Sequence, residues 1–193
     1  MRNIILLGVI LALVASPALG NPLDGKFEFG VQGGMNMPTG TISDGTNNGY
    51  VFGVNAGFRP VDMFVIGAEF AIFGNGAADD ILNLLGPTAD VTTTTYQYAL
   101  MAKFMMPVLE MHDVYAKGTL GAYTSSVDLK NITGFADNSF SDTNVGFGLG
   151  AGFRFNTAMK YSFFAEGMYN NINGEFENLQ MFTFQAGVMI ALP

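Results

Sequence analysis

The sequence predicts an all-β fold: an eight-stranded antiparallel up-and-down transmembrane β-barrel, preceded by a signal peptide. Three observations lead to this prediction. Past residue 20 the chain has eight long runs with large apolar residues at every second position, it has no helical pattern of any length, and its gaps alternate between long and short. Ordinary strands average five or six residues, whereas tilted membrane-spanning strands need about nine to eleven. The expected strands are residues 26–37, 50–59, 63–74, 93–106, 114–125, 143–156, 161–171 and 181–192.

The N-terminus has the pattern of an export signal. Arg2 is followed by an apolar run from Ile4 to Ala15 and by small residues at Ala18 and Gly20, which is typical of a secretory signal peptide. A retained anchor helix is the alternative, but the run is short for a bilayer span of about 20 residues. We expect residues 1–20 to be a cleaved signal peptide and residues 21–193 to form one barrel domain.

Composition excludes several functional classes. The chain has no cysteine, so it can form neither disulfides, thiolate metal sites nor a lipoprotein anchor. Its formal net charge is −8, whereas nucleic-acid binding requires a basic patch. We therefore expect an exported acidic protein that binds no nucleic acid.

The gaps between the runs suggest how the strands are connected. Four gaps are long, and the three turns 60–62, 107–113 and 157–160 are short. Long loops at one end and tight turns at the other are typical of an outer-membrane barrel. Both ends of the chain then belong to the periplasmic side. The long gaps are residues 38–49, 75–92, 125–142 and 171–180.

Within the expected strands, side chains alternate between two faces, and we call the set of positions on one face a parity. Charged residues occur on only one of the two parities. The opposite parity is apolar and uncharged, as lipid requires, because a basic residue at the bilayer midplane costs about 2–4 kcal/mol. A soluble lipocalin-like barrel or a sandwich would reverse the two faces, but strand length, loop alternation and the placement of aromatic residues favour the membrane barrel. The expected aromatic girdles are Tyr50, Phe73, Tyr96, Tyr169 and Phe182 at the long-loop end, and Phe27, Phe58, Phe64, Phe104, Phe155 and Tyr161 at the other; Phe73 fits poorly because its parity is inward.

The segment 144–155, "NVGFGLGAGFRF", carries glycine at every second position from Gly146 to Gly152. Neither the dinucleotide-loop nor the P-loop spacing occurs there. We interpret it as a strand whose glycines face the lumen and leave room for side chains from opposite strands.

An eight-stranded barrel is just wide enough for side chains to fill, and buried charges need partners. We expect a salt-bridged plug in the periplasmic half, with Arg154 and Glu166 paired across the 157–160 turn, and a small polar vestibule in the outer half. An inert filled core and a narrow pore both fit this pattern. The expected charge network is Lys26, Glu28, Arg59, Glu69, Lys103, Lys117, Arg154 and Glu166. The expected vestibule lining is Gly34, Asn36, Gly53, Asn55, Thr95, Gln97, Tyr123, Gly146, Gly148 and Asn170.

No residue pattern predicts a catalytic, cofactor or metal site. The single histidine, His112, falls in a periplasmic turn, where we expect a solvated side chain. The acids of 78–80 and Asp128, Asp137 and Asp142 could attract Ca²⁺, but they lack EF-hand spacing. Residues 81–85, "ILNLL", could form a short helix that packs over the barrel mouth or contacts a partner.

The segment "NVGFGLGAGFRF", the turn "TAMK" and the following "YSFFAEGMYN" resemble the small eight-stranded outer-membrane barrels of the OmpA/OmpX type. The resemblance implies an integral protein in the outer membrane of a Gram-negative-type bacterium, with outer-membrane lipid and the barrel-assembly machinery as partners. We expect a non-enzymatic protein with an envelope-structural or surface-interaction role through acidic extracellular loops and an unidentified surface ligand. The alternative is a narrow, porin-like transport barrel for a small solute.

Overall fold

The computed structural model describes residues 26–40, 45–78, 82, 90–109, 112–131, 137–157, 161–174 and 178–192. The expected signal peptide lies outside these residues, as does segment 81–85 except for Leu82. The described residues contain no helix that is long and apolar enough to span a membrane. The strands are β1 (Lys26–Thr39), β2 (Gly49–Val61), β3 (Phe64–Gly76), β4 (Asp90–Leu109), β5 (His112–Lys130), β6 (Asn138–Asn156), β7 (Tyr161–Ile172) and β8 (Leu179–Leu192).

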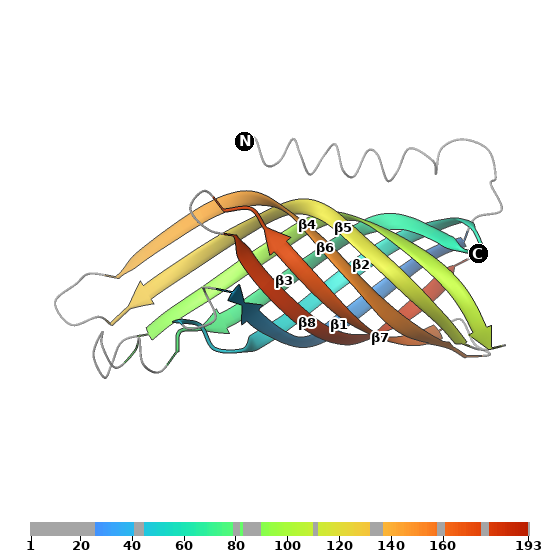
Figure 1. Cartoon of the computed structure of the whole chain (residues 1–193), viewed down its shortest axis with the longest axis horizontal. Coiled ribbons are helices and arrows are strands. Elements are labelled where there is room, and N and C mark those ends of the chain that lie inside the picture. Colours follow the sequence, from blue (N-terminus) through green and yellow to red (C-terminus); the bar gives the residue numbers. More distant parts are fainter. Residues whose placement is uncertain are drawn as a thin grey trace.

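The strands pair in chain order, and β8 returns to β1, so the antiparallel sheet closes on itself (Figure 1). The expected fold class is therefore confirmed. Pairing extends over most of each strand: Phe27 to Thr39 of β1 lie opposite Leu192 to Gln180 of β8. Closure leaves the membrane-spanning part of the sheet without free edges.

Three neighbouring strands are longer than expected. β4, β5 and β6 have 20, 19 and 19 residues, against 12 in β7. Much of the expected loop 125–142 is therefore strand, with residues 125–129 paired to 138–142. Val127, Leu129 and Phe140 alternate there with serine, aspartate and lysine, and the aromatic and β-branched residues among them favour strands. These strand ends extend beyond the rest of the barrel on the left of Figure 1.

Side-chain exposure confirms which face of the sheet is outward. Phe29, Phe52 and Leu149, on the apolar parity, are 47, 57 and 61% exposed. Glu28 and Lys103, on the charged parity, are each 2% exposed. The apolar parity therefore forms the outer surface and the charged parity fills the lumen.

The aromatic girdles follow this outward face with one exception. Tyr50 and Tyr96 face outward toward the long-loop end, and Phe104 and Tyr161 do so toward the short-turn end. Phe73 is 1% exposed and points into the lumen, so its assignment to a girdle was wrong. Its inward parity is the physical reason.

The β6 glycines accommodate neighbouring strands and not opposite ones, which corrects our expectation. A Cβ on Gly152 would collide with the Tyr115 ring of β5, and one on Gly146 would approach the Tyr123 ring. A Cβ on Gly150 would meet the Gly167 carbonyl of β7. The bare glycine surface thus seats two tyrosines of β5 against the inner wall.

Candidate functional site

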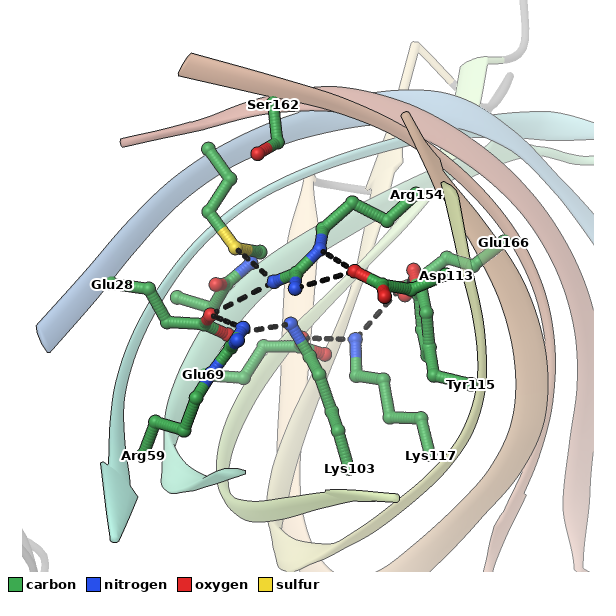
Figure 2. Close-up of polar contacts among 12 residues, drawn as sticks. Glu28, Arg59, Glu69, Lys103, Asp113, Tyr115, Lys117, Arg154, Ser162 and Glu166 are labelled. Atoms are coloured by element: carbon green, nitrogen blue, oxygen red, sulfur yellow. Dashed lines mark hydrogen bonds and ion pairs between the residues drawn. The ribbon is translucent and has the colours of Figure 1, made fainter. Parts of the chain in front are cut away.

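The lumen contains a cluster of ion pairs in its short-turn half (Figure 2). Each residue of the expected charge network whose side chain the structure describes forms an ion pair. The side chain of Lys26, at the start of β1, lies outside the described part of the chain. These residues come from seven strands, one from each of β1 to β7, so the cluster joins segments far apart in the sequence.

The ion pairs form two groups, and Glu28 of β1 is the centre of the group nearer the short turns, which we call the lower group. Its Oε2 accepts hydrogen bonds from Arg59 Nη2 at 3.1 Å and from Arg154 Nη1 at 3.2 Å. Its Oε1 lies 3.7 Å from Lys103 Nζ. Three cations thus share one carboxylate whose side chain is 3% exposed.

Arg154 has a second carboxylate partner that the sequence analysis missed. Its Nε and Nη2 donate to Asp113 Oδ2 at 3.0 and 2.7 Å, and Asn156 Nδ2 donates to the same oxygen at 2.7 Å. We had assigned Asp113 to a turn, but it lies in β5. It shares the inward parity of Lys117, and that parity was the available signal.

The expected direct pair of Arg154 with Glu166 is wrong. In the β6–β7 ladder, Arg154 lies opposite Phe164, whereas Glu166 lies opposite Gly152. The two charges are therefore offset along the barrel, and each finds other partners.

Lys117 is the centre of the upper group. Its Nζ lies 2.5 Å from Glu69 Oε2 and 2.6 Å from Glu166 Oε1. Tyr115 donates its hydroxyl to the other oxygen of Glu166 at 2.8 Å. With Asp113 included, the ion pairs of the described lumen involve four cations and four carboxylates, so their charges balance: Arg59, Lys103, Lys117 and Arg154 against Glu28, Glu69, Asp113 and Glu166.

An apolar layer closes the lumen toward the long-loop end. Its six members come from β2, β3, β5, β7 and β8, and each is at most 2% exposed: Val51, Ala71, Phe73, Tyr123, Ile172 and Met181. The open polar vestibule expected there is therefore wrong, because large apolar residues occupy the inward parity near the ends of these strands. Expected lining residues such as Asn36, Gln97 and Asn170 are instead buried.

The opposite end of the lumen is open. A hollow of about 340 Å³ at the short-turn end is lined by residues that include Glu28, Arg59, Asp113 and Arg154. The lumen is thus a blind-ended well: its ion pairs are reached from the short-turn side, and the apolar layer seals the long-loop side.

The second candidate site lies outside the barrel. We call it the protruding sheet: residues 90–95 of β4, 124–130 of β5 and 138–144 of β6. Its outer face is rich in hydroxyl groups, with Thr124 and Thr143 hydrogen-bonded at 2.9 Å. Its charged side chains are Asp90, Asp128, Asp142 and Lys130, with Asp137 directly before β6.

His112 is not the solvated turn residue we expected. It begins β5, and its ring centroid lies 5.3 Å from that of Phe153 and 4.9 Å from that of Phe155. Its parity is that of Val114, on the outer face. No group of three or more metal-ligating acids, histidines or cysteines occurs among the described residues, and Asp128 and Asp142 lie on strands, not loops.

Comparison with known proteins identifies the family. The model of the outer membrane protein beta-barrel domain matches residues 5–190. The chain belongs to this family. It is therefore an outer membrane protein. Barrels of this kind have short turns on the periplasmic side and longer loops on the outside. No curated protein matches the chain.

Solved structures show the same fold at low sequence identity. Neisserial surface protein A is 18% identical with a TM-score of 0.65, covering 85% of this chain and 96% of that one. Ail, the attachment invasion locus protein of Yersinia pestis, in complex with the heparin analogue sucrose octasulfate, is 16% identical with a TM-score of 0.58, covering 87 and 99%. OprG from Pseudomonas aeruginosa is 13% identical with a TM-score of 0.50, covering 86 and 95%.

Proposed function

We propose that this protein is a closed, non-enzymatic barrel that acts at the cell surface, where the protruding sheet binds cationic partners. The observation that carries this proposal is the contrast between its two candidate sites. The lumen is filled by ion pairs and blocked at the long-loop end by the apolar layer, whereas the protruding sheet is exposed and charged. We further propose that residues 1–20 direct export and are removed.

The sealed lumen supports a role outside the barrel. A solute entering from the periplasm meets the ion pairs of Glu28 and Lys117 and then the apolar layer. Passage requires separating the ion pairs and opening the apolar layer, and leaving a buried charge without its partner costs about 3–5 kcal/mol. The non-enzymatic proposal is supported by His112, because its imidazole packs between aromatic rings on the outer face, away from the lumen.

The charge of the protruding sheet supports a cationic partner. Asp90, Asp128 and Asp142 are opposed by Lys130 alone within the sheet. Opposite charge steers a partner toward such a surface and suppresses partners of like charge. Ail was solved with a polysulfated ligand, and we expect this chain to reject that ligand class.

A binding assay on vesicles tests the proposal. The barrel is refolded into zwitterionic vesicles, and its binding to poly-lysine and to sucrose octasulfate is measured at low and at physiological salt. We expect poly-lysine to bind, more weakly as salt increases, and the polysulfate not to bind. A variant with Asp90, Asp128 and Asp142 all changed to asparagine should lose most of the binding. Equal binding by this variant, or preference for the polysulfate, contradicts the proposal.

The alternative function, a narrow pore, has one observation in its favour. Gln32 Nε2, Asn55 Oδ1 and Gln185 Oε1 are buried in the lumen and have no hydrogen-bond partner among the described residues, and water could satisfy them. Planar-bilayer recordings separate the two functions. We expect a quiet wild-type barrel, and steady conductance would promote the pore.

A further inference from the structure

The hollow at the short-turn end lies beside two irregularities in the strands around it. The ladder between β2 and β3 shifts after Phe58, so that Arg59 and Pro60 together lie against the single residue Val65. A second shift occurs in β4 directly after Pro107. Such bulges bend a strand and turn its side chains, and they are common at the rims of barrels and beside functional sites. Arg59 and Pro107 both line the hollow.

Arg59 carries unused hydrogen-bond donors at this hollow. A guanidinium has five N–H groups, and the side chain of Arg59 is 18% exposed. Among the described residues this side chain makes one hydrogen bond, from Nη2 to Glu28 Oε2, and it shares that oxygen with Arg154 (Figure 2). A guanidinium that is largely withdrawn from water and still has donors left over is suited to receive an anion.

The charges around the hollow favour an anion with a single charge. With Asp113 included, the lower group has three cations and two carboxylates. Asp113 is already matched by Arg154, which donates to it through Nε and Nη2. One further carboxylate would therefore equalise the cations and carboxylates of this group. Asp62 is exposed and also lines the hollow, where its charge repels a ligand with a second negative charge.

The remaining lining fits a hydrocarbon body. Phe27, Met63, Pro107 and Ala191 lie in the wall beside the polar residues, and Met63 is 46% exposed. Ligand pockets combine apolar walls with a few polar groups that orient the ligand, and they measure about 300–1,000 Å³. The 340 Å³ of this hollow is at the small end of that range. It therefore suits a compact ligand with one ring or one short chain.

We propose that this hollow binds small monocarboxylates with an apolar body, whose carboxylate pairs with Arg59 and whose body lies against Phe27 and Met63. The two oxygens of a planar carboxylate match the parallel N–H groups of a guanidinium. The apolar layer blocks the lumen beyond the ion pairs, so the ligand binds without crossing the barrel. Because barrels of this kind hold their short turns in the periplasm, the ligand comes from that compartment. The site is separate from the protruding sheet and does not rest on the function proposed for it.

The test measures the binding of benzoate to the refolded barrel in zwitterionic nanodiscs by NMR titration. Three related probes each change one property: benzamide lacks the charge, acetate lacks the ring, and phenyl phosphate carries a second charge. We expect benzoate to shift the Arg59 Nε–H resonance and to bind at least about tenfold more tightly than benzamide. Acetate and phenyl phosphate should also bind more weakly than benzoate. Tighter binding of benzamide or of phenyl phosphate contradicts the proposed ligand class.

Two substitutions test the site itself. Arg59→Gln removes the charge but keeps an amide that can donate to Glu28, and it should weaken benzoate binding at least about tenfold. Ala191→Trp fills the hollow without removing a charged group and should abolish binding, whereas Ala191→Ser should bind as wild type does. Asp62→Asn should strengthen the binding of phenyl phosphate severalfold.

The matched charge control is Lys130→Gln, which removes a cation from the protruding sheet and should leave benzoate binding unchanged. Heat-dependent gel mobility verifies that each variant is a folded barrel. The proposal is overturned if wild type does not bind benzoate, if Arg59→Gln or Ala191→Trp binds it as wild type does, or if Lys130→Gln weakens it as much as Arg59→Gln. Ala191→Trp should still bind poly-lysine, so failure of this site and failure of the surface function are distinguishable.

Discussion

Replacing Glu28 by glutamine should weaken the barrel because it removes a carboxylate shared by three cations. Lys103 is 2% exposed, and Glu28, 3.7 Å away, is the one carboxylate with which it pairs in the described structure. Arg59 also loses its ion pair, whereas Arg154 keeps Asp113. The substitution therefore leaves one fully buried cation and one partly exposed cation unpaired.

The magnitude follows from these exposures. Leaving a buried charge without its partner costs about 3–5 kcal/mol. Arg59 adds at most about 1 kcal/mol, since its side chain is 18% exposed and reaches water. The Tyr115 and Phe164 rings lie 5.6 and 5.8 Å from Lys103 Nζ and offset part of the loss. We expect a total decrease of about 3–5 kcal/mol in the free energy of unfolding.

The assay is urea unfolding in lipid vesicles. The chain contains no tryptophan, so circular dichroism and the gel mobility of the folded barrel are the appropriate signals. Glu166→Gln is the comparison, because Lys117 keeps Glu69 and the cost should be only about 1–3 kcal/mol. Changing Lys103 to methionine as well as Glu28 to glutamine should recover most of the stability, since no buried ammonium remains. The reasoning fails if Glu166→Gln costs more than Glu28→Gln, or if the second substitution restores nothing.

Three further predictions concern the lipid-facing surface, the two layers that block the lumen (the ion-pair cluster and the apolar layer), and His112. Leu149→Arg on the lipid face should cost about 2–4 kcal/mol, measured by the same unfolding assay, whereas Leu149→Phe should be nearly neutral; equal effects would reverse the inside and outside assignment. Phe73→Ala should destabilise the barrel by about 3–5 kcal/mol. Neither Phe73→Ala nor Glu166→Ala alone should raise single-channel conductance, because the apolar layer and the ion-pair cluster block the lumen one after the other. Only the double variant should conduct. His112→Ala should cost about 1 kcal/mol or less and leave any lipid-modifying activity unchanged, and loss of such an activity would contradict the non-enzymatic proposal.

Strand number, pairing order and face assignment were predictable because a membrane barrel requires strict period-two alternation. Leu149 and Glu28 were assigned to the correct faces by parity alone. Parity could also have predicted two features of the lumen that we missed. Asp113 shares the inward parity of Lys117, and Phe73 fitted poorly as a girdle residue because it belongs to the apolar layer inside the lumen.

The partners within the lumen were not predictable from the sequence. Strand tilt and the offset between neighbouring strands decide which inward side chains meet at one height of the barrel. Glu28 and Arg154 are 126 positions apart, and no local pattern relates them. The protruding sheet was missed for a different reason: its serine and threonine residues are equally common in loops.

The balanced lumen has a consequence for how the barrel enters the membrane. Lys117 of β5 reaches its two carboxylate partners, Glu69 of β3 and Glu166 of β7, only when three non-adjacent strands are in place. A single hairpin that inserted first would expose such a charge to lipid, at a cost of about 2–4 kcal/mol for a lysine near the midplane. We therefore expect insertion to be concerted: the nascent sheet stays hydrated on its inner side until β1 meets β8, and water leaves the lumen in the same step that closes the seam.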